Sequence, residues 1–252
     1  MGIETKKSIT KKWLPNWVLK LNLTFYKIIR KEVNIMGIKT KKPMVKETVG
    51  ALYYSFNKGN ENGDFDEASY EDEVVKSEVV KNISTTENAE SVIVRASGKV
   101  YDTVNSNEYI DMAIEIVAFD PADLAKMRAD KIGESGLNRS GATKKRPFFA
   151  FGKVKKLLNG GVEYAWYPKC QLVENTDDIG TKEENFSEQN DTITIRAYDY
   201  NNDEDKKTWV NSEMSNYPKG LTEDKFFSKP ILTDDDLTNV ITAKSQEEVV
   251  GA

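Results

Sequence analysis

The chain has 252 residues, of which 38% are hydrophobic and 31% charged, which is enough apolar material for a packed core and argues against wholesale disorder. It contains no histidine and a single cysteine, Cys170. These counts exclude an internal disulfide, a zinc site of the Cys/His type and catalysis that depends on imidazole. What remains is chemistry by carboxylates, lysines or hydroxyls, or no chemistry at all, and we expect no enzyme, no metal and no cofactor.

The charge is unevenly distributed along the chain. The net charge is -5, but residues 1–35 hold eight Lys and Arg against two Glu, which leaves the rest of the chain at -11. An acidic body is not expected to grip nucleic acid through its phosphates. It suits a surface that a polyanion can pass without sticking.

Residues 1–35 are predicted to be a translated leader or a disordered basic extension. Their apolar stretch, Trp13–Ile29, is too short and too polar to span a bilayer, and no small-residue cleavage site follows it. Lys31–Val33 can be encoded by the purine-rich bacterial ribosome-binding sequence, and Met36 follows at a short spacing. We therefore expect Met36 to be the initiator. A basic amphipathic membrane helix is the alternative.

The first elements expected after Met36 are a strand and a long loop. Thr48–Phe56 is rich in β-branched and aromatic residues and predicts a strand. The polar segment Asn57–Tyr70 predicts an exposed loop of a length that usually serves a purpose. Apolar stretches predict further strands within Val74–Val80, Ser91–Arg95 and Lys99–Val104.

The clearest alternation of apolar and polar residues lies in Ile110–Phe119. One face of this segment is apolar from Ile110 to Ala118, whereas the other begins with Asp111 and Glu115. This pattern predicts a half-buried strand of a β-sandwich. The functional interpretation of the same pattern places Asp111 and Glu115 on an exposed acidic face.

One helix is clearly marked. Asp120 can cap it, Pro121 suits its first position, and Gly133 is a natural stop. Its apolar stripe is narrow, so we expect the helix to lie on the edge or at the mouth of a sheet.

A loop and a hairpin are expected next. The loop runs to a basic end, Lys144–Arg146, which is either a solvated loop end or a phosphate contact. Phe148–Val154 and Val162–Val173 predict two strands, and Asn159–Gly161 between them is a strong hairpin signal. The single cysteine falls in the second of these strands and is predicted to be a buried structural thiol.

The C-terminal part predicts one more strand, at Asp191–Tyr200, then a polar turn and a loosely held tail from Ser228. Seven to nine strands and one helix predict a mainly β fold. We expect an antiparallel β-sandwich flanked by one α-helix, with a long loop and flexible terminal arms. The sandwich domain is placed at residues 36–233 and the C-terminal tail at residues 234–252.

Four motifs carry a family resemblance through their order. They are a basic arm leading into TVGALYY (48–54), IEIVAFDP (114–121) running from strand into helix, PFFAFG (147–152) with the hairpin to YAWYPK (164–169), and FFSK (226–229). From about residue 36 to 233 the chain resembles the major tail tube proteins of siphophages, the long, non-contractile-tailed phages, of Gram-positive bacteria. Residues 1–35 match nothing in that pattern.

The resemblance implies a structural virion protein that forms homo-hexameric rings, which stack into the phage tail tube and conduct DNA into the host. Its partners would be copies of itself, the tape measure protein and tail completion or terminator proteins. DNA would pass transiently, no membrane would be involved, and assembly would take place in the host cytoplasm. On this interpretation Asp111 and Glu115 face the lumen. The ring-stacking loop, expected to gain order only on stacking, contains Asn57, Gly59, Asn62, Gly63 and Asp64.

Three other interpretations stay open. The chain could be a tube protein of a contractile tail or of a related secretion machine. It could also be an extracellular or surface β-sandwich module that binds carbohydrate or protein. The third is a carboxylate hydrolase, which needs two converging carboxylates and aromatic platforms such as Trp166, Tyr167 and Trp209.

Overall fold

The computed structural model describes residues 40–60, 63–141, 145–177, 179–181 and 189–243. The chain divides into two compact units, Met1–Pro43 and Met44–Ala252, and the fold described below belongs to the second. The predicted leader, residues 1–35, lies outside the described residues.

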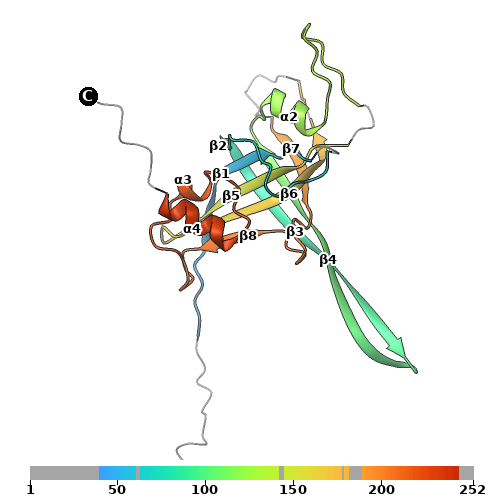
Figure 1. Cartoon of the computed structure of the whole chain (residues 1–252), viewed down its shortest axis with the longest axis vertical. Coiled ribbons are helices and arrows are strands. Elements are labelled where there is room, and N and C mark those ends of the chain that lie inside the picture. Colours follow the sequence, from blue (N-terminus) through green and yellow to red (C-terminus); the bar gives the residue numbers. More distant parts are fainter. Residues whose placement is uncertain (1–39, 61–62, 142–144, 178, 182–188, 244–252) are drawn as a thin grey trace, which may run out of the picture. The chain divides into compact units, whose positions relative to one another are not determined.

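The described residues form eight strands in one antiparallel sheet (Figure 1). The strands are β1 (Lys46–Phe56), β2 (Val75–Ser77), β3 (Val80–Ala96), β4 (Lys99–Ile116), β5 (Phe149–Leu157), β6 (Val162–Thr176), β7 (Asp191–Ala197) and β8 (Thr208–Asn211). Their order across the sheet is β2-β1-β5-β6-β7-β4-β3, and β8 pairs with β6. The prediction of a mainly β, antiparallel fold is confirmed.

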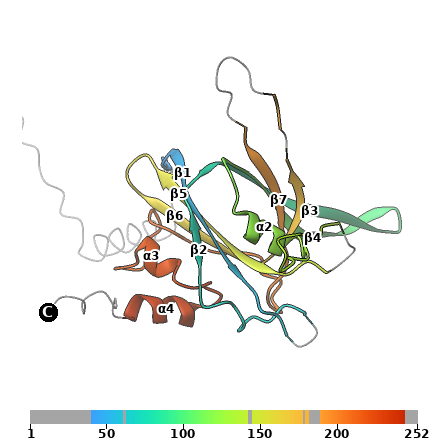
Figure 2. The same cartoon turned by 90° about the horizontal axis from the view of Figure 1, so that it is seen from above.

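The sheet curls so that strands from its two ends share one core (Figure 2). Leu52 of β1, Met112 of β4 and Ile195 of β7 lie in the same cluster, and each is 0% exposed. Ile83 of β3 packs against this cluster as well. Because β1 and β3 stand far apart in the strand order and yet meet at one core, the fold is sandwich-like, as predicted.

The alternation predicted in β4 is confirmed. Ile110, Met112, Ile114 and Ile116 are all buried at 3% exposure or less. The intervening side chains point away from the core because successive residues of a strand face opposite sides of the sheet.

A second core lies on the other face of β1, β5 and β6. Trp166 is fully buried there, and its indole Nε1 donates a hydrogen bond to the carbonyl oxygen of Phe226 at 3.0 Å. Phe227 stacks on Tyr53 with ring centroids 3.9 Å apart. Two short helices, α3 (Glu223–Phe226) and α4 (Asp234–Thr242), supply much of this cover, as Figure 1 shows.

The C-terminal segment corrects the expectation of a loose tail from Ser228. Ile231 and Val240 are only 3% and 7% exposed, so the described part of this segment belongs to the second core. The acidic run after Thr233 is the first turn of α4. The Thr233 side chain accepts from the backbone of Asp236, whose own carboxylate accepts in return, and this reciprocal cap begins the helix.

The predicted helix exists but is shorter than expected. It is α2 (Pro121–Met127), and Asp120 Oδ1 caps it by accepting from two backbone N–H groups at 2.9 and 3.1 Å. It ends well before Gly133, because Ala129 takes a left-handed φ of 60°. The N–H of Ala129 then donates to the carbonyl of residue 126 and that of Asp130 to the carbonyl of residue 125, which closes the helix. With α3 and α4, the described residues contain three helices rather than the predicted one.

The strands predicted at residues 91–95 and 99–104 are the distal parts of β3 and β4. The two strands form one hairpin, continuous from the pair Val80–Ile116 to the pair Ala96–Lys99. Its turn residues, Ser97 and Gly98, have φ angles of 51° and 76°, the conformation that a tight two-residue turn requires.

Candidate assembly surfaces

The predicted stacking loop is held in shape by its own hydrogen bonds. Asn57 is only 8% exposed, and its Oδ1 accepts from the N–H groups of Gly59 at 3.0 Å and Asp66 at 3.2 Å. Asn60 Oδ1 accepts from the N–H of Asp64 at 2.9 Å. Gly59 has a φ of 70°, and a Cβ there would stand 3.0 Å from the carbonyl oxygen of Asp64. The described part of the loop thus has internal hydrogen bonds of its own, and its ordering on stacking stays a prediction.

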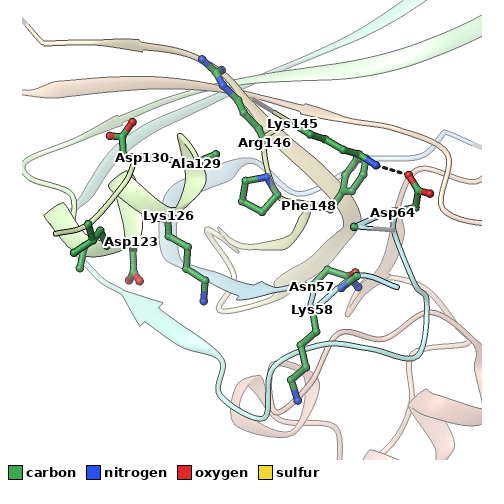
Figure 3. A pocket seen from close by; sticks show the side chains of 15 residues that line it. Asn57, Lys58, Asp64, Asp123, Lys126, Ala129, Asp130, Lys145, Arg146 and Phe148 are labelled. Carbon is green, nitrogen blue, oxygen red and sulfur yellow. Dashed lines mark hydrogen bonds and ion pairs between the residues drawn. The ribbon is translucent and has the colours of Figure 1, made fainter. Parts of the chain in front are cut away.

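A cavity of about 660 Å³ lies between this loop, α2 and the chain just before β5 (Figure 3). Asn57, Gly59, Gly63 and Asp64 all line it, so the structure brings four of the predicted loop residues to one place. Asn62 lies outside the described residues. The role of these residues in ring stacking stays a prediction.

Ion pairs connect the walls of this cavity. Figure 3 shows Lys145 directed at Asp64, with which it forms an ion pair. Lys126 of α2 has its Nζ 2.6 Å from the Glu71 carboxylate and 4.0 Å from the centroid of the Phe56 ring. Each contact joins segments that are far apart in the sequence. The loop and α2 are thereby fixed to the sheet.

At its described residues, the basic loop end at 144–146 is exposed at Lys145, as expected of a solvated end, and half-buried at Arg146. Arg146 Nη1 donates to the carbonyl oxygens of Leu172 at 2.5 Å and Val173 at 2.8 Å. Lys145 is engaged with Asp64, and Lys144 lies outside the described residues. Arg146 therefore attaches the loop end to β6, and Lys145 attaches it to the loop of residues 57–70.

The two predicted lumen carboxylates are half-buried and have partners. Asp111 accepts two hydrogen bonds from Arg196, from Nε at 2.7 Å and from Nη2 at 3.0 Å. These bonds raise the pKa of the Arg196 guanidinium. Glu115 Oε1 accepts from Asn190 Nδ2 at 2.8 Å. The charge of Asp111 is compensated within the chain, contrary to the expectation of an exposed acidic face, and the lumen position of both residues stays a prediction.

These carboxylates belong to a broader surface on β3, β4, β7 and β6. The strand register aligns its side chains in rows on the face opposite the first core. All its members are exposed or half-buried. We call this surface the polar face, and it consists of Asn82, Ser84, Thr86, Asp111, Glu115, Gln171, Glu174, Thr192, Thr194 and Arg196.

The distal part of the β3–β4 hairpin projects away from the rest of the sheet (Figure 1). Four apolar side chains of this part are exposed, namely Ile93 at 51%, Val94 at 40%, Val100 at 56% and Tyr101 at 77%. Ile93 and Val94 are consecutive, so both faces of the hairpin carry apolar groups. Within the described residues, β3 is the last strand of the sheet and pairs only with β4. Exposed apolar groups beside an open strand edge are typical of an interface between chains.

Sequence reasoning missed the hairpin as a functional surface. Two strand-like segments around Ser97–Gly98 were visible, and they are a hairpin signal. Their exposure was not visible, because apolar residues in a strand look the same whether the strand lies inside a sandwich or beyond it.

Among the described residues, no group of three or more Cys, Asp and Glu side chains could hold a metal ion. Trp166 and Tyr167 are at most 1% exposed and cannot serve as sugar platforms, whereas Trp209 is 46% exposed. Cys170 is fully buried, as predicted, and burial raises the pKa of its thiol well above the usual value. The helices in the described ranges are all too short or too polar to cross a membrane.

No protein-family model and no curated protein matches the chain. Among solved structures, it is similar to a chain in the cryo-electron microscopy structure of the baseplate of the anti-feeding prophage. That likeness has a TM-score of 0.38 and 9% sequence identity, and it covers 69% of this chain and 100% of the other. A likeness this low carries no argument about function.

Proposed function

We propose that this chain is a structural protein of a phage tail, which polymerises as stacked homo-hexameric rings into the tail tube of a siphophage. The observation that carries the proposal is the projecting β3–β4 hairpin, with its open strand edge and its exposed apolar side chains. The order of motifs between residues 36 and 233, which resembles that of tail tube proteins, supports it further.

The hairpin suits a contact between unlike surfaces of two copies. A long strand edge can add to the sheet of a neighbour, because main-chain N–H and C=O groups along β3 then find partners. A repeated contact between two different patches forms a closed ring when the rotation from one copy to the next adds up to a full turn. It forms a filament when that rotation does not close. A ring that stacks on further rings needs both kinds of contact, and the cavity beside residues 57–70 supplies a second, separate surface.

The polar face is the surface that we assign to the lumen. Its hydroxyl and amide side chains hold water, and its acidic groups outnumber its single cation, Arg196. Such a wall gives DNA phosphates few cations to bind, so DNA can pass without adhesion. In the virion the other partners would be the tape measure protein and the tail completion or terminator proteins.

Electron microscopy of the purified protein tests the proposal. We expect rings or hollow tubes from the unaltered chain, and a monomer from the double variant Ile93→Asp/Tyr101→Asp. Burying one such side chain contributes about 1.5–3 kcal/mol, so its loss weakens each contact roughly tenfold to a hundredfold. Leu158→Asp is the matched control, because Leu158 is 66% exposed at the turn between β5 and β6. An unaltered chain that stays monomeric at high concentration would refute the proposal.

The lumen assignment has its own test. Glu115→Lys places a cation on the polar face and leaves the Asp111–Arg196 pair intact. We expect tubes that assemble normally but release DNA more slowly, measured as the rate of DNA ejection from phage particles that carry the variant. Asp72→Lys is the control, because the Asp72 side chain is fully exposed and lies outside the polar face. Unchanged ejection in Glu115→Lys would contradict this lumen assignment.

A further inference from the structure

A second cavity, of about 760 Å³, opens between the β5–β6 pair and β3, on the core side of the sheet. Five lysines line it, namely Lys46, Lys81, Lys153, Lys155 and Lys207. Three carboxylates face them, those of Glu47, Glu87 and Glu163. The excess of cations contrasts with the acidic composition of the chain after residue 35.

Lys153 is the central group of this cavity. It follows Phe149 and Phe151 on the inward face of β5, at the point where the apolar core gives way to polar side chains. Its Nζ donates to Thr85 Oγ1 at 2.6 Å and stands 5.2 Å from the centroid of the Tyr167 ring. No carboxylate of the described residues lies within ion-pair distance of this Nζ.

The neighbouring lysines are already paired. Lys155 forms an ion pair with Glu163, and Lys207 lies 3.7 Å from Glu87. The carboxylates nearest to Lys153 are thus engaged with other cations. A half-buried ammonium group with neutral partners only is costly, because the hydroxyl of Thr85 does not neutralise its charge.

The protonation equilibrium of Lys153 agrees with this geometry. Burial, followed by the repulsion of Lys155 and Lys207, lowers its pKa to about 8, against a smaller opposing effect of Glu163. Lys46 lowers the same pKa. Burial and neighbouring cations therefore both disfavour the charged form of Lys153, and an anion that enters the cavity beside it would stabilise that form.

We propose that this cavity binds a phosphate group, which forms an ion pair with Lys153 and receives further hydrogen bonds from the lysines at the cavity mouth. Lys153 has only the Thr85 hydroxyl and the Tyr167 ring as close partners, and a phosphate anion would supply the negative charge that these neutral groups lack. A compact anion with several acceptor oxygens also suits donors that arrive from different strands. The proposal is independent of tube assembly, because the cavity is built within a single chain.

The test is a titration of the full-length protein with inorganic phosphate at pH 7.5, followed by calorimetry and by the thermal unfolding midpoint. We expect saturable binding and a raised midpoint, because a ligand that binds only the folded state stabilises it. Lys153→Met should lose at least tenfold in affinity. Lys156→Met is the matched control, since Lys156 is an exposed residue of the same strand that does not line the cavity.

The pH dependence provides a second readout. Between pH 7.5 and 9.5 the charged fraction of a lysine with a pKa of about 8 falls roughly twentyfold, and the affinity should fall with it. The other charged or titratable side chains that line the cavity are those of Lys46, Glu47, Lys81, Glu87, Lys155, Glu163, Tyr167 and Lys207. Circular dichroism at both pH values shows whether the fold persists.

Three outcomes would overturn the proposal. The first is the absence of saturable phosphate binding to the unaltered protein. The second is equal binding by the Lys153→Met variant, which would show general attraction to surface cations. The third is that acetate or citrate binds as tightly as phosphate, which would assign the cavity to carboxylates instead. A phosphate monoester that binds more tightly than inorganic phosphate would support the proposal and point to a larger ligand.

Discussion

The packing of Phe227 against Gly152 leads to a sharp prediction about the second core. Phe227 is 3% exposed and stacks on Tyr53 with an angle of 2° between the rings. A Cβ added at Gly152 would stand 2.7 Å from Phe227 Cε1 and 3.1 Å from Trp166 Cε3. No real Cβ approaches a ring carbon as closely as 2.7 Å, so Gly152→Ala forces the Phe227 ring to move.

The expected energies follow from this geometry. Gly152→Ala overpacks the site and should cost about 1–3 kcal/mol of unfolding free energy. Phe227→Ala leaves a cavity and should cost about 3–5 kcal/mol. If the two changes acted independently, the double variant would lose about 4–8 kcal/mol, a large part of the stability of a typical domain. Because the added methyl group enters the space that the ring leaves, we expect the double variant to lose no more than Phe227→Ala alone.

The measurement is a double-mutant cycle by urea unfolding, followed by circular dichroism at a concentration that keeps the protein monomeric. The two changes should show a coupling of at least about 1 kcal/mol. Phe65→Ala is the matched control, since Phe65 packs on Tyr70 and Phe148 elsewhere, and its effect should add to that of Gly152→Ala. Additivity within about 0.5 kcal/mol for Gly152 and Phe227 would refute the reasoning.

Three further predictions concern charges and the thiol. Asp111→Asn should cost about 0.5–1.5 kcal/mol in urea unfolding, because it weakens a bidentate pair between half-exposed groups; an unchanged midpoint would contradict the pairing. Burial alone would raise the pKa of Asp236, but hydrogen bonds from Lys229 and Thr233 outweigh it and lower that pKa. Asp236 therefore stabilises the fold above about pH 4, and this contribution should vanish as the pH falls through the lowered pKa, so the thermal midpoint of Asp236→Asn should change less with acid. Cys170 should resist an aromatic disulfide reagent in the folded protein and react fully in urea, whereas rapid reaction without urea would contradict its burial.

The parts of the fold that the sequence predicted correctly are those set by local rules. The alternation from Ile110 to Ile116 needs only the two-residue period of a strand. Asp120 and Pro121 begin α2 because capping depends on neighbours within three residues. The turn at Asn159–Gly161 follows from glycine's tolerance of positive φ, and Gly160 has a φ of 79°.

The errors have two different causes. The C-terminal segment did carry a local signal, Thr233 followed by Asp236 three residues later, and the acidic run obscured it. The end of α2 had no such signal, because Ala129 adopts a left-handed conformation that alanine seldom takes. The helix propensity of the residues after Met127 favoured a longer helix. The hydrogen bonds donated by the N–H groups of Ala129 and Asp130 end it earlier.

The candidate surfaces depended on contacts that no local pattern contains. Asp111 and Arg196 are 85 positions apart in the sequence and meet only because β4 and β7 are neighbours in the sheet. Lys153 meets Thr85 only because the sheet curls over its own core. Strand order, rather than sequence spacing, decides which charges are compensated and which are not.

This distinction changes what the acidic composition means for a conduit. A net charge of -11 after residue 35 suggested a wall of unpaired carboxylates. On the polar face, however, Asp111 is neutralised by Arg196, while Glu115 and Glu174 are separated by hydroxyl-bearing side chains such as Thr194. A wall of this kind would resist adhesion chiefly because it offers phosphates almost no free cation, and only secondarily because it repels them. We therefore expect that freeing the Arg196 guanidinium from Asp111 affects DNA passage more than losing one unpaired carboxylate of the polar face does.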